Sequence, residues 1–174
     1  MTLDRARRPG PTVRTRVHEL SAGADRVHED RLATEEPLEI RLAWPGALPT
    51  PEVVRRLPDL LRQRQPVFDR TGGVHAAALA TADGDLLVVR EDVGRHNAVD
   101  KVTGARVLAG AVPAEACLVV SGRAGFELVQ QAIAAGVGSL VAVGAPTSLS
   151  ARLAQESGLV LYGFTGPDRC VRYT

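Results

Sequence analysis

Three short apolar segments in the C-terminal half, separated by helical patterns, constrain the fold of this chain more than any other feature. The segments are Ala116–Val120, Leu140–Val143 and Leu159–Tyr162. The stretches between them, about 125–135 and 148–156, carry apolar residues at helical spacing. Continuous apolar runs of this length are typical of strands that a parallel sheet buries on both faces. The alternation therefore predicts an α/β domain whose C-terminal strands pair in parallel through right-handed crossovers.

The region before these segments adds an expected helix and an expected hairpin. Thr50 is a natural N-cap and Pro51 fits the first helical turn, so a helix is expected over about 51–65. Pro58 is able to split this helix in two. Asp83-Gly84 is typical of a two-residue hairpin turn. The remaining expected elements are a strand over 74–81, whose alanine-rich part also suits a helix, a strand over 86–89 and a helix over 95–108.

A single domain is expected over residues 35–174, after a leader. Residues 1–34 are polar and rich in arginine, which favours a flexible leader. The alternation in Val13–Val17 favours an edge strand there instead, and Glu35–Leu42 alternates more clearly and predicts a strand. A length of 174 residues is enough for one domain with a core and leaves little for a second.

Charge, hydropathy and cysteine patterns exclude several classes of protein. The net charge of +1 offers no electrostatic argument for binding nucleic acid or an anionic membrane. No apolar run approaches the length of a membrane span, and the N-terminus lacks the apolar core of a secretory signal. The two cysteines, Cys117 and Cys170, form no Cys-x-x-Cys pair and no disulfide framework. This usage suits a reducing, cytoplasmic environment.

A dense polar segment, Glu91–Lys101, lies where the strand over 86–89 meets the helix over 95–108. Open α/β folds bind ligands beyond the carboxyl ends of their strands, so this junction is a candidate site. Within it, His96 suits a general base or a cofactor ligand, and equally a capping or surface histidine.

Three loops that follow strands are expected to lie at one edge of the sheet: Ser121–Arg123, Gly144–Thr147 and Gly163–Arg169. The first two lead into helix N-termini, whose free N–H groups and dipole favour anions. Arg95, Arg123 and Arg169 are expected to converge there. Such a group suits a phosphate or a pyrophosphate.

Common motifs for nucleotide loops, zinc sites and serine nucleophiles are absent from the sequence. There is no P-loop and no Gly-x-Gly-x-x-Gly after a strand. The histidines, at positions 18, 28, 75 and 96, lack ligand spacing, so no metal is expected. Ser121 lacks a nucleophile elbow. Cys117 lies within a strand and is interpreted as an inert core thiol, whereas Cys170, beside Arg169 and Arg172, is the only candidate for a reactive thiol.

The polar segment Glu91-Asp92-Val93-Gly94-Arg95-His96-Asn97-Ala98-Val99-Asp100-Lys101 is also a specific sequence signature, and shorter motifs accompany it in a fixed order. These are Glu35–Ile40, Phe68-x-x-Thr71-Gly72-Gly73-x-His75-Ala76-Ala77, Ser121-Gly122-Arg123, Ala145-Pro146-Thr147 and Gly163-Phe164. The set resembles one family, the formate dehydrogenase accessory sulfurtransferases (FdhD/NarQ). The resemblance covers residues 35–42 and essentially all of 66–174.

This resemblance implies a three-layer α/β/α sandwich of the cytidine deaminase-like type, with a mixed sheet. It also implies a carrier that moves sulfur from a cysteine desulfurase to the bis-molybdopterin guanine dinucleotide cofactor of formate dehydrogenase. In the family, the sulfur is a persulfide on a Cys-x-x-Cys loop, and the segment after the last main strand binds part of the cofactor. By position that segment is Phe164-Thr165-Gly166-Pro167-Asp168-Arg169 in this chain.

The chain departs from the family in one block. Between Leu42 and Pro51 the family has strands, a helix and the Cys-x-x-Cys loop, and these are absent here, so a deletion is placed near 43–50. Persulfide transfer needs a thiolate, and neither cysteine matches the family's catalytic position. A zinc-dependent deaminase is excluded as well, because His75-Ala76-Ala77 lacks the glutamate that serves as its general acid and base.

The sequence therefore favours a shortened FdhD-like formate dehydrogenase accessory protein, a sulfur carrier by resemblance. It is expected to bind the guanine-nucleotide part of the cofactor through Arg95, His96, Asn97, Arg123 and the 164–169 loop. If sulfur transfer is retained, it is expected to run through Cys170. The alternatives are a non-catalytic binding module and an inactive truncated paralogue. Expected partners are the desulfurase, formate dehydrogenase and a second copy that covers an open sheet edge.

Overall fold

The structure of the protein is a computed structural model that describes residues 12–21, 24–33, 46–111 and 115–174. Its contacts divide the chain into two units, Met1–Ile40 and Arg41–Thr174. In the first unit, β1 (Thr12–Ser21) and β2 (Ala24–Ala33) pair along their whole length in an antiparallel two-stranded sheet. The strand expected at residues 13–17 is part of β1, whereas the strand expected at residues 35–42 lies outside the described residues.

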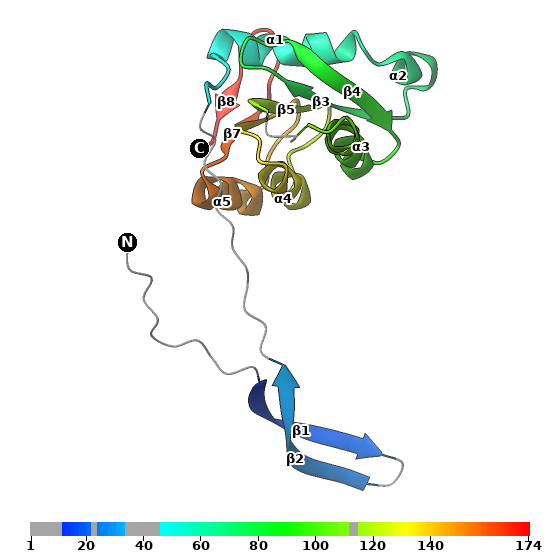
Figure 1. Cartoon of the computed structure of the whole chain (residues 1–174), viewed down its shortest axis with the longest axis vertical. Helices are drawn as coiled ribbons and strands as arrows, with labels where there is room; N and C mark the ends of the chain where they lie inside the picture. The colour runs from blue at the N-terminus through cyan, green and yellow to red at the C-terminus, as the bar shows by residue number, and fades with distance from the viewer. Residues whose placement is uncertain (1–11, 22–23, 34–45, 112–114) are drawn as a thin grey trace. The chain divides into compact units, whose positions relative to one another are not determined.

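The second unit is built on a six-stranded sheet with the order β4-β3-β5-β6-β7-β8 (Figure 1). The central pairs β5–β6 and β6–β7 are parallel, and the pairs on either side of them are antiparallel. This arrangement confirms the predicted mixed sheet with parallel C-terminal strands. The strands are β3 (His75–Ala80), β4 (Leu86–Asp92), β5 (Cys117–Val120), β6 (Ser139–Ala142), β7 (Val160–Gly163) and β8 (Val171–Arg172).

Helices cover both faces of this sheet, so the unit has the three layers that the sequence predicts. In Figure 1, α1 lies on one side of the sheet, and α3, α4 and α5 lie on the other. The helices are α1 (Pro51–Arg62), α2 (Pro66–Thr71), α3 (Arg95–Leu108), α4 (Phe126–Ala134) and α5 (Ser148–Ser157).

The strands divide their side chains between two apolar cores. Along β3, Ala77 and Leu79 join the core under α3, α4 and α5, while Ala78 joins the core under α1. The neighbouring strand follows the same alternation, with Leu118 in the first core and Val119 in the second. Both leucines and this valine are fully buried. Because each such side chain contributes roughly 1.5–3 kcal/mol on burial, the central strands hold the layers together.

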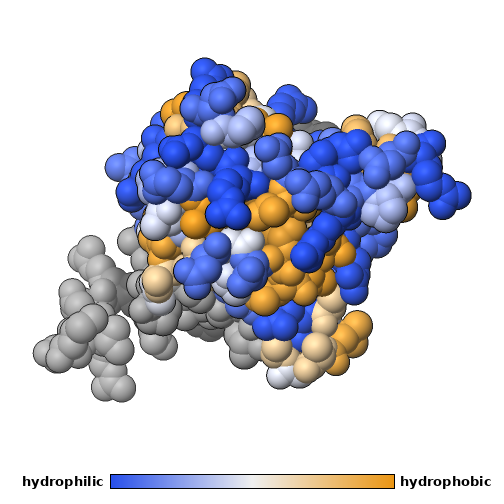
Figure 2. Space-filling view, turned by 90° about the horizontal axis from the view of Figure 1, so that it is seen from above, coloured by the Kyte–Doolittle hydropathy of each residue, from blue (hydrophilic) through white to orange (hydrophobic). Residues whose placement is uncertain are grey.

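The face of the sheet under α1 is only partly covered by the described residues. Val53 and Leu60 of α1, and Leu86 and Val89 of β4, pack against the core on this side but stay partly accessible. Figure 2 views the side that carries α1 in Figure 1, and it shows an area of apolar side chains surrounded by polar ones. The inner strands β5 and β6 are buried throughout.

Local signals set the helix boundaries largely as predicted. The side chain of Thr50 accepts a hydrogen bond from the Val53 N–H (3.4 Å) and begins α1. The helix runs through Pro58 without a break and ends at Arg62, three residues before the predicted end. Thr147 forms a capping box with Ser150 at the start of α5. The second helix, α2, follows α1 after a short turn and has no counterpart among the predicted elements.

The β3–β4 hairpin is present, but its loop is longer than the predicted two residues. Thr81 N–H donates to the Asp85 carbonyl (3.0 Å), so residues 82–84 form the tip of the loop. Gly84 has a φ of +95° and closes the turn by donating to the Thr81 carbonyl (3.1 Å). The loop packs against α1, because a Cβ built on Gly84 would lie 2.9 Å from Cγ1 of Val53.

We expect Gly84→Ala to destabilise the second unit by about 1–3 kcal/mol, because the new methyl group meets both a positive φ and Val53. Gly104→Ala is the control. Gly104 lies inside α3, and a Cβ added to it would have nothing within 4 Å, so alanine there should stabilise by about 0.5–1 kcal/mol. Urea unfolding of both variants measures the difference. Equal effects of the same sign would show that the close packing of the hairpin on α1 is wrong.

Candidate functional site

The signature segment after β4 forms a closed network of hydrogen bonds at the start of α3. Asp92 Oδ1 accepts hydrogen bonds from the Gly94 N–H (2.8 Å) and from Asn97 Nδ2 (3.1 Å). Lys101 Nζ lies 2.5 Å from Asp92 Oδ2 and donates to the Glu91 carbonyl (3.1 Å). The hydrogen bond from Lys101, followed by those from Gly94 and Asn97, lowers the pKa of Asp92 to about 2. These polar side chains therefore shape the strand-to-helix junction, and the Asn97 amide is already engaged within it.

Glu91, the first residue of the segment, connects β4 to α2. Its two carboxylate oxygens accept hydrogen bonds from the N–H groups of Val67 (2.9 Å) and Phe68 (2.8 Å), in the first turn of α2. The N-cap residue of this helix, Gln65, makes no capping hydrogen bond with its own side chain. A carboxylate at a helix N-terminus is favourable both for hydrogen bonding and for the helix dipole. Glu91 thus acts as the cap of α2 from a distant part of the chain.

The other end of the segment ties α3 to α4. Gln131 Nε2 donates to Asp100 Oδ1 (2.6 Å) and to the His96 carbonyl (3.4 Å). The His96 side chain is placed differently: its Nε2 atom is buried, has no hydrogen-bond partner within the described part of the chain, and lies 4.0 Å from Glu127 Oε2. Of the polar side chains in the signature, those of Arg95 and His96 are the ones left without hydrogen bonds among the described residues.

Arg95 and Arg123 line one cavity of about 230 Å³ at the N-terminus of α4. The N-cap of this helix, Gly125, has no side chain to satisfy the first N–H groups. Neither arginine forms an ion pair within the described ranges, and Glu127 is the carboxylate that lines the cavity with them. Two guanidinium groups beside a helix N-terminus favour an anionic ligand.

The three loops that follow the parallel strands lie side by side, as the predicted topology requires. Gly144 N–H donates to the Gly122 carbonyl (3.0 Å), and Phe164 N–H donates to the Gly144 carbonyl (3.1 Å). The loops are packed so closely that a Cβ on Gly144 would lie 2.9 Å from Cγ of Arg123. Groups from all three loops are therefore available at one edge of the sheet.

The last of these loops, Phe164–Arg169, lines a second cavity of about 290 Å³. Thr165 is 4% exposed, and its hydroxyl group has no hydrogen-bond partner in the described part of the structure. Phe164 has a φ of +48°, the one positive φ at a described residue other than glycine. The Arg169 guanidinium lies 5.4 Å from the Phe164 ring centroid. This arginine lines a cavity other than the one that Arg95 and Arg123 share.

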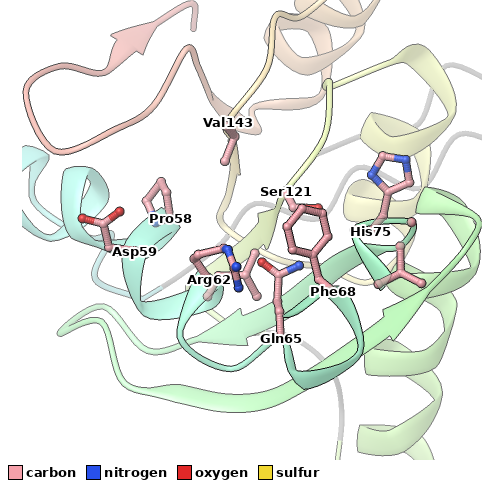
Figure 3. Close-up of a pocket in the computed structure, with 12 residues that line it drawn as sticks. Pro58, Asp59, Arg62, Gln65, Phe68, His75, Ser121 and Val143 are labelled. Carbon is pink, nitrogen blue, oxygen red and sulfur yellow. The ribbon is translucent and has the colours of Figure 1, made fainter. Parts of the chain in front are cut away.

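A third and larger cavity, of about 580 Å³, lies between α1, α2 and the ends of β3, β5 and β6 (Figure 3). His75 and Ser121, both in motifs of the signature set, line it. Gln65, Phe68 and Arg62 also line it, and the sequence patterns assign no ligand role to these three side chains. Val143 lines both this cavity and the one formed by the 164–169 loop, so the two cavities adjoin.

The two cysteines lie in different surroundings. Cys117 is fully buried in β5, and burial raises the pKa of its thiol to about 12, so it holds no thiolate at neutral pH. Cys170 is half-buried and packs against the core under α1. Within the described residues, no group of three or more His, Cys, Asp or Glu side chains is placed to hold a metal ion. No helix in those ranges is long and apolar enough to cross a membrane.

Comparison with known proteins gives consistent matches. Residues 8–174 match the model of the FdhD/NarQ family. The "Sulfur carrier protein FdhD" of Corynebacterium efficiens is 50% identical over 141 residues, which are 79% of this chain and 51% of the relative. The protein of the same name from Nocardia farcinica is 51% identical over 165 residues, or 91% of this chain and 57% of the relative. The chain thus spans about half the length of the curated relatives it matches.

The fold also has a counterpart among solved structures. A crystal structure described as that of a formate dehydrogenase accessory protein from Desulfotalea psychrophila superimposes with a TM-score of 0.71. The match covers 94% of this chain and 97% of that one, at 19% sequence identity. At this level of identity, the match supports the three-layer fold of the protein.

The network around Asp92 predicts a specific dependence of stability on pH. Its pKa of about 2 in the folded state lies below the ordinary value of 3.8, so the stability it contributes is present above about pH 4. This contribution is lost as the pH falls through 4 towards 2. We expect Asp92→Asn to melt at a lower temperature than the parent at pH 6. The gap between the two melting temperatures should shrink between pH 4 and pH 2, and a gap that stays constant over this range would contradict the assigned network.

Proposed function

Because the chain belongs to the FdhD/NarQ family, we propose that it is a formate dehydrogenase accessory protein that binds the molybdenum cofactor by its guanine-nucleotide part. The loop Phe164–Arg169 would contact the phosphates of bis-molybdopterin guanine dinucleotide, with Arg95, His96 and Arg123 on the adjoining surface. The relatives are named sulfur carriers, and the solved relative is described as an accessory protein of formate dehydrogenase. Formate dehydrogenase is therefore the proposed client.

The observation that carries this proposal is the buried, unpartnered hydroxyl of Thr165. Leaving such a group without a hydrogen bond costs about 1–3 kcal/mol, so native proteins usually satisfy it. In this loop the hydroxyl belongs to a residue that lines an open cavity, beside Gly166, where an added Cβ would have nothing within 4 Å. A phosphate oxygen in the cavity would accept a hydrogen bond from this hydroxyl. The positive φ of Phe164 is a further local cost of the kind found at ligand-binding loops.

The charge around these loops supports an anionic ligand. Arg95, Arg123 and Arg169 make no ion pair with any described residue, so their charges are not neutralised within the second unit. Guanidinium groups bind phosphate oxygens through pairs of hydrogen bonds. One carboxylate also lines each of the two cavities, Asp168 beside Arg169 and Glu127 beside Arg95 and Arg123. The bound cofactor would supply the phosphates and the base, and this chain would supply the surface that holds them.

We propose that Cys117 takes no part in a sulfur step. A persulfide forms on a thiolate. Because the pKa of Cys117 is raised, this residue stays a protonated thiol at neutral pH. Cys170 is the remaining thiol in this chain, and it is half-buried against the core under α1. If this chain carries sulfur, Cys170 is the thiol left to hold it. The sulfur carried by the longer relatives would be held on a Cys-x-x-Cys loop, which this sequence does not contain.

Isothermal titration calorimetry with GDP, used as a fragment of the cofactor, tests the proposal. We expect the parent chain to bind GDP, and Arg169→Ala to weaken binding about 10- to 100-fold through the loss of charged hydrogen bonds. Arg95→Ala should weaken it in the same direction without lowering the melting temperature. Arg152→Ala, which removes an exposed arginine of α5, is the matched control and should bind as the parent does. No binding by the parent at millimolar GDP would show that the proposed site is wrong.

A further inference from the structure

The 580 Å³ cavity between α1 and α2 has the size and the lining of a site for a small planar ligand. Figure 3 shows Arg62 of α1, and Gln65 and Phe68 at the start of α2, gathered on one side of it, with Ser121 close by and the His75 ring turned away from them. The role proposed above for the 164–169 loop leaves this cavity unassigned.

The side chain of Gln65 is the strongest indication of a ligand. Gln65 is only 3% exposed, yet its amide has no hydrogen-bond partner among the described residues. Figure 3 shows the amide pointing into the space between Arg62 and Phe68. The amide keeps contact with the solvent of the cavity, so a ligand there can reach both its oxygen and its nitrogen. It offers one acceptor and two donors side by side, a pattern that matches the edge of a heteroaromatic base.

The Phe68 ring and the Arg62 guanidinium over it form an aromatic wall next to this amide, and other side chains hold both in place. The Arg62 guanidinium lies 4.7 Å from the Phe68 ring centroid and is anchored by Asp69 (2.6 Å). The backbone of Phe68 is bound in turn by the carboxylate of Glu91 (2.8 Å). Aromatic rings and guanidinium planes are the surfaces on which nucleic-acid bases stack. The wall is therefore ordered before any ligand arrives.

A further hydrogen-bond donor lies across the cavity. The Ser121 Oγ accepts a hydrogen bond from the Ala76 N–H (2.9 Å), which leaves the hydroxyl proton free to be donated. Like Gln65, this group is uncharged. Gln65 and Ser121 offer uncharged groups that suit a neutral base better than a phosphate, and the charge of Arg62, which also lines the cavity, is paired with Asp69.

We propose that this cavity binds a purine base, with Gln65 pairing to its edge and Phe68 contacting its face. The assignment rests on the proposed function, because the base would belong to the same nucleotide whose phosphates lie against the 164–169 loop. Val143 lines both cavities, so one ligand can occupy the two without crossing the protein. Base recognition in one cavity is thus separate from phosphate recognition in the next.

The test compares GDP with inorganic pyrophosphate as ligands of the intact chain. We expect Gln65→Leu to weaken GDP binding about 5- to 100-fold, as for the loss of a bidentate contact to a base, and to leave pyrophosphate binding unchanged. Gln63→Leu is the matched control, since it makes the same change at an exposed position two residues away. Phe68→Leu keeps the apolar volume but removes the aromatic face, so it should act in the same direction as Gln65→Leu.

Each outcome separates this inference from the function it rests on. If the parent binds GDP and both Gln65→Leu and Phe68→Leu retain its affinity, the base does not occupy this cavity and only this inference is overturned. If the parent binds neither ligand, the proposed function fails and the base site fails with it. Selective loss of GDP binding in either cavity variant, with pyrophosphate binding and melting temperature kept, supports the assignment.

Discussion

Two adjacent carboxylates at the end of β4, those of Glu91 and Asp92, position the helices that line the candidate cavities. Glu91 caps α2 by accepting hydrogen bonds from two backbone N–H groups, and Asp92 organises the start of α3 with the help of Lys101. One strand end thereby positions two helices. Of these two helices, α2 carries Phe68, which lines the 580 Å³ cavity, and α3 carries Arg95. These contacts tie Phe68 of α2 and the start of α3 to the end of the same strand.

The elements that depend on local patterns were predictable from the sequence. The helix expected over 95–108 matches α3, and the three apolar runs become β5, β6 and β7, because their burial on both faces leaves a continuous apolar signal. The helix α2 was not predictable, because it has six residues and its cap comes from Glu91, which is distant in sequence. The length of the β3–β4 loop likewise depends on the hydrogen bonds of Thr81 rather than on the Asp-Gly pair alone.

The candidate site was predictable in outline but not in its chemistry. The sequence indicates that polar residues gather at the carboxyl ends of the strands, and it indicates the adjoining loops. It does not indicate that Asn97 and Lys101 already bond to Asp92 at the strand–helix junction, because this partner is identified only by geometry. Gln65 gives no signal in the sequence at all. It lies in a polar stretch before a proline, and its importance follows from burial beside a cavity that α1 and α2 form together.

The central claim is that a nucleotide spans two adjoining cavities on either side of Val143. Titration of isotopically labelled protein with GDP, followed by nuclear magnetic resonance, tests this most directly. The side-chain amide of Gln65 and the backbone amides of Thr165 and Gly166 should shift together, with one common dissociation constant. Shifts confined to one cavity, or to the opposite face around α5, would contradict the claim.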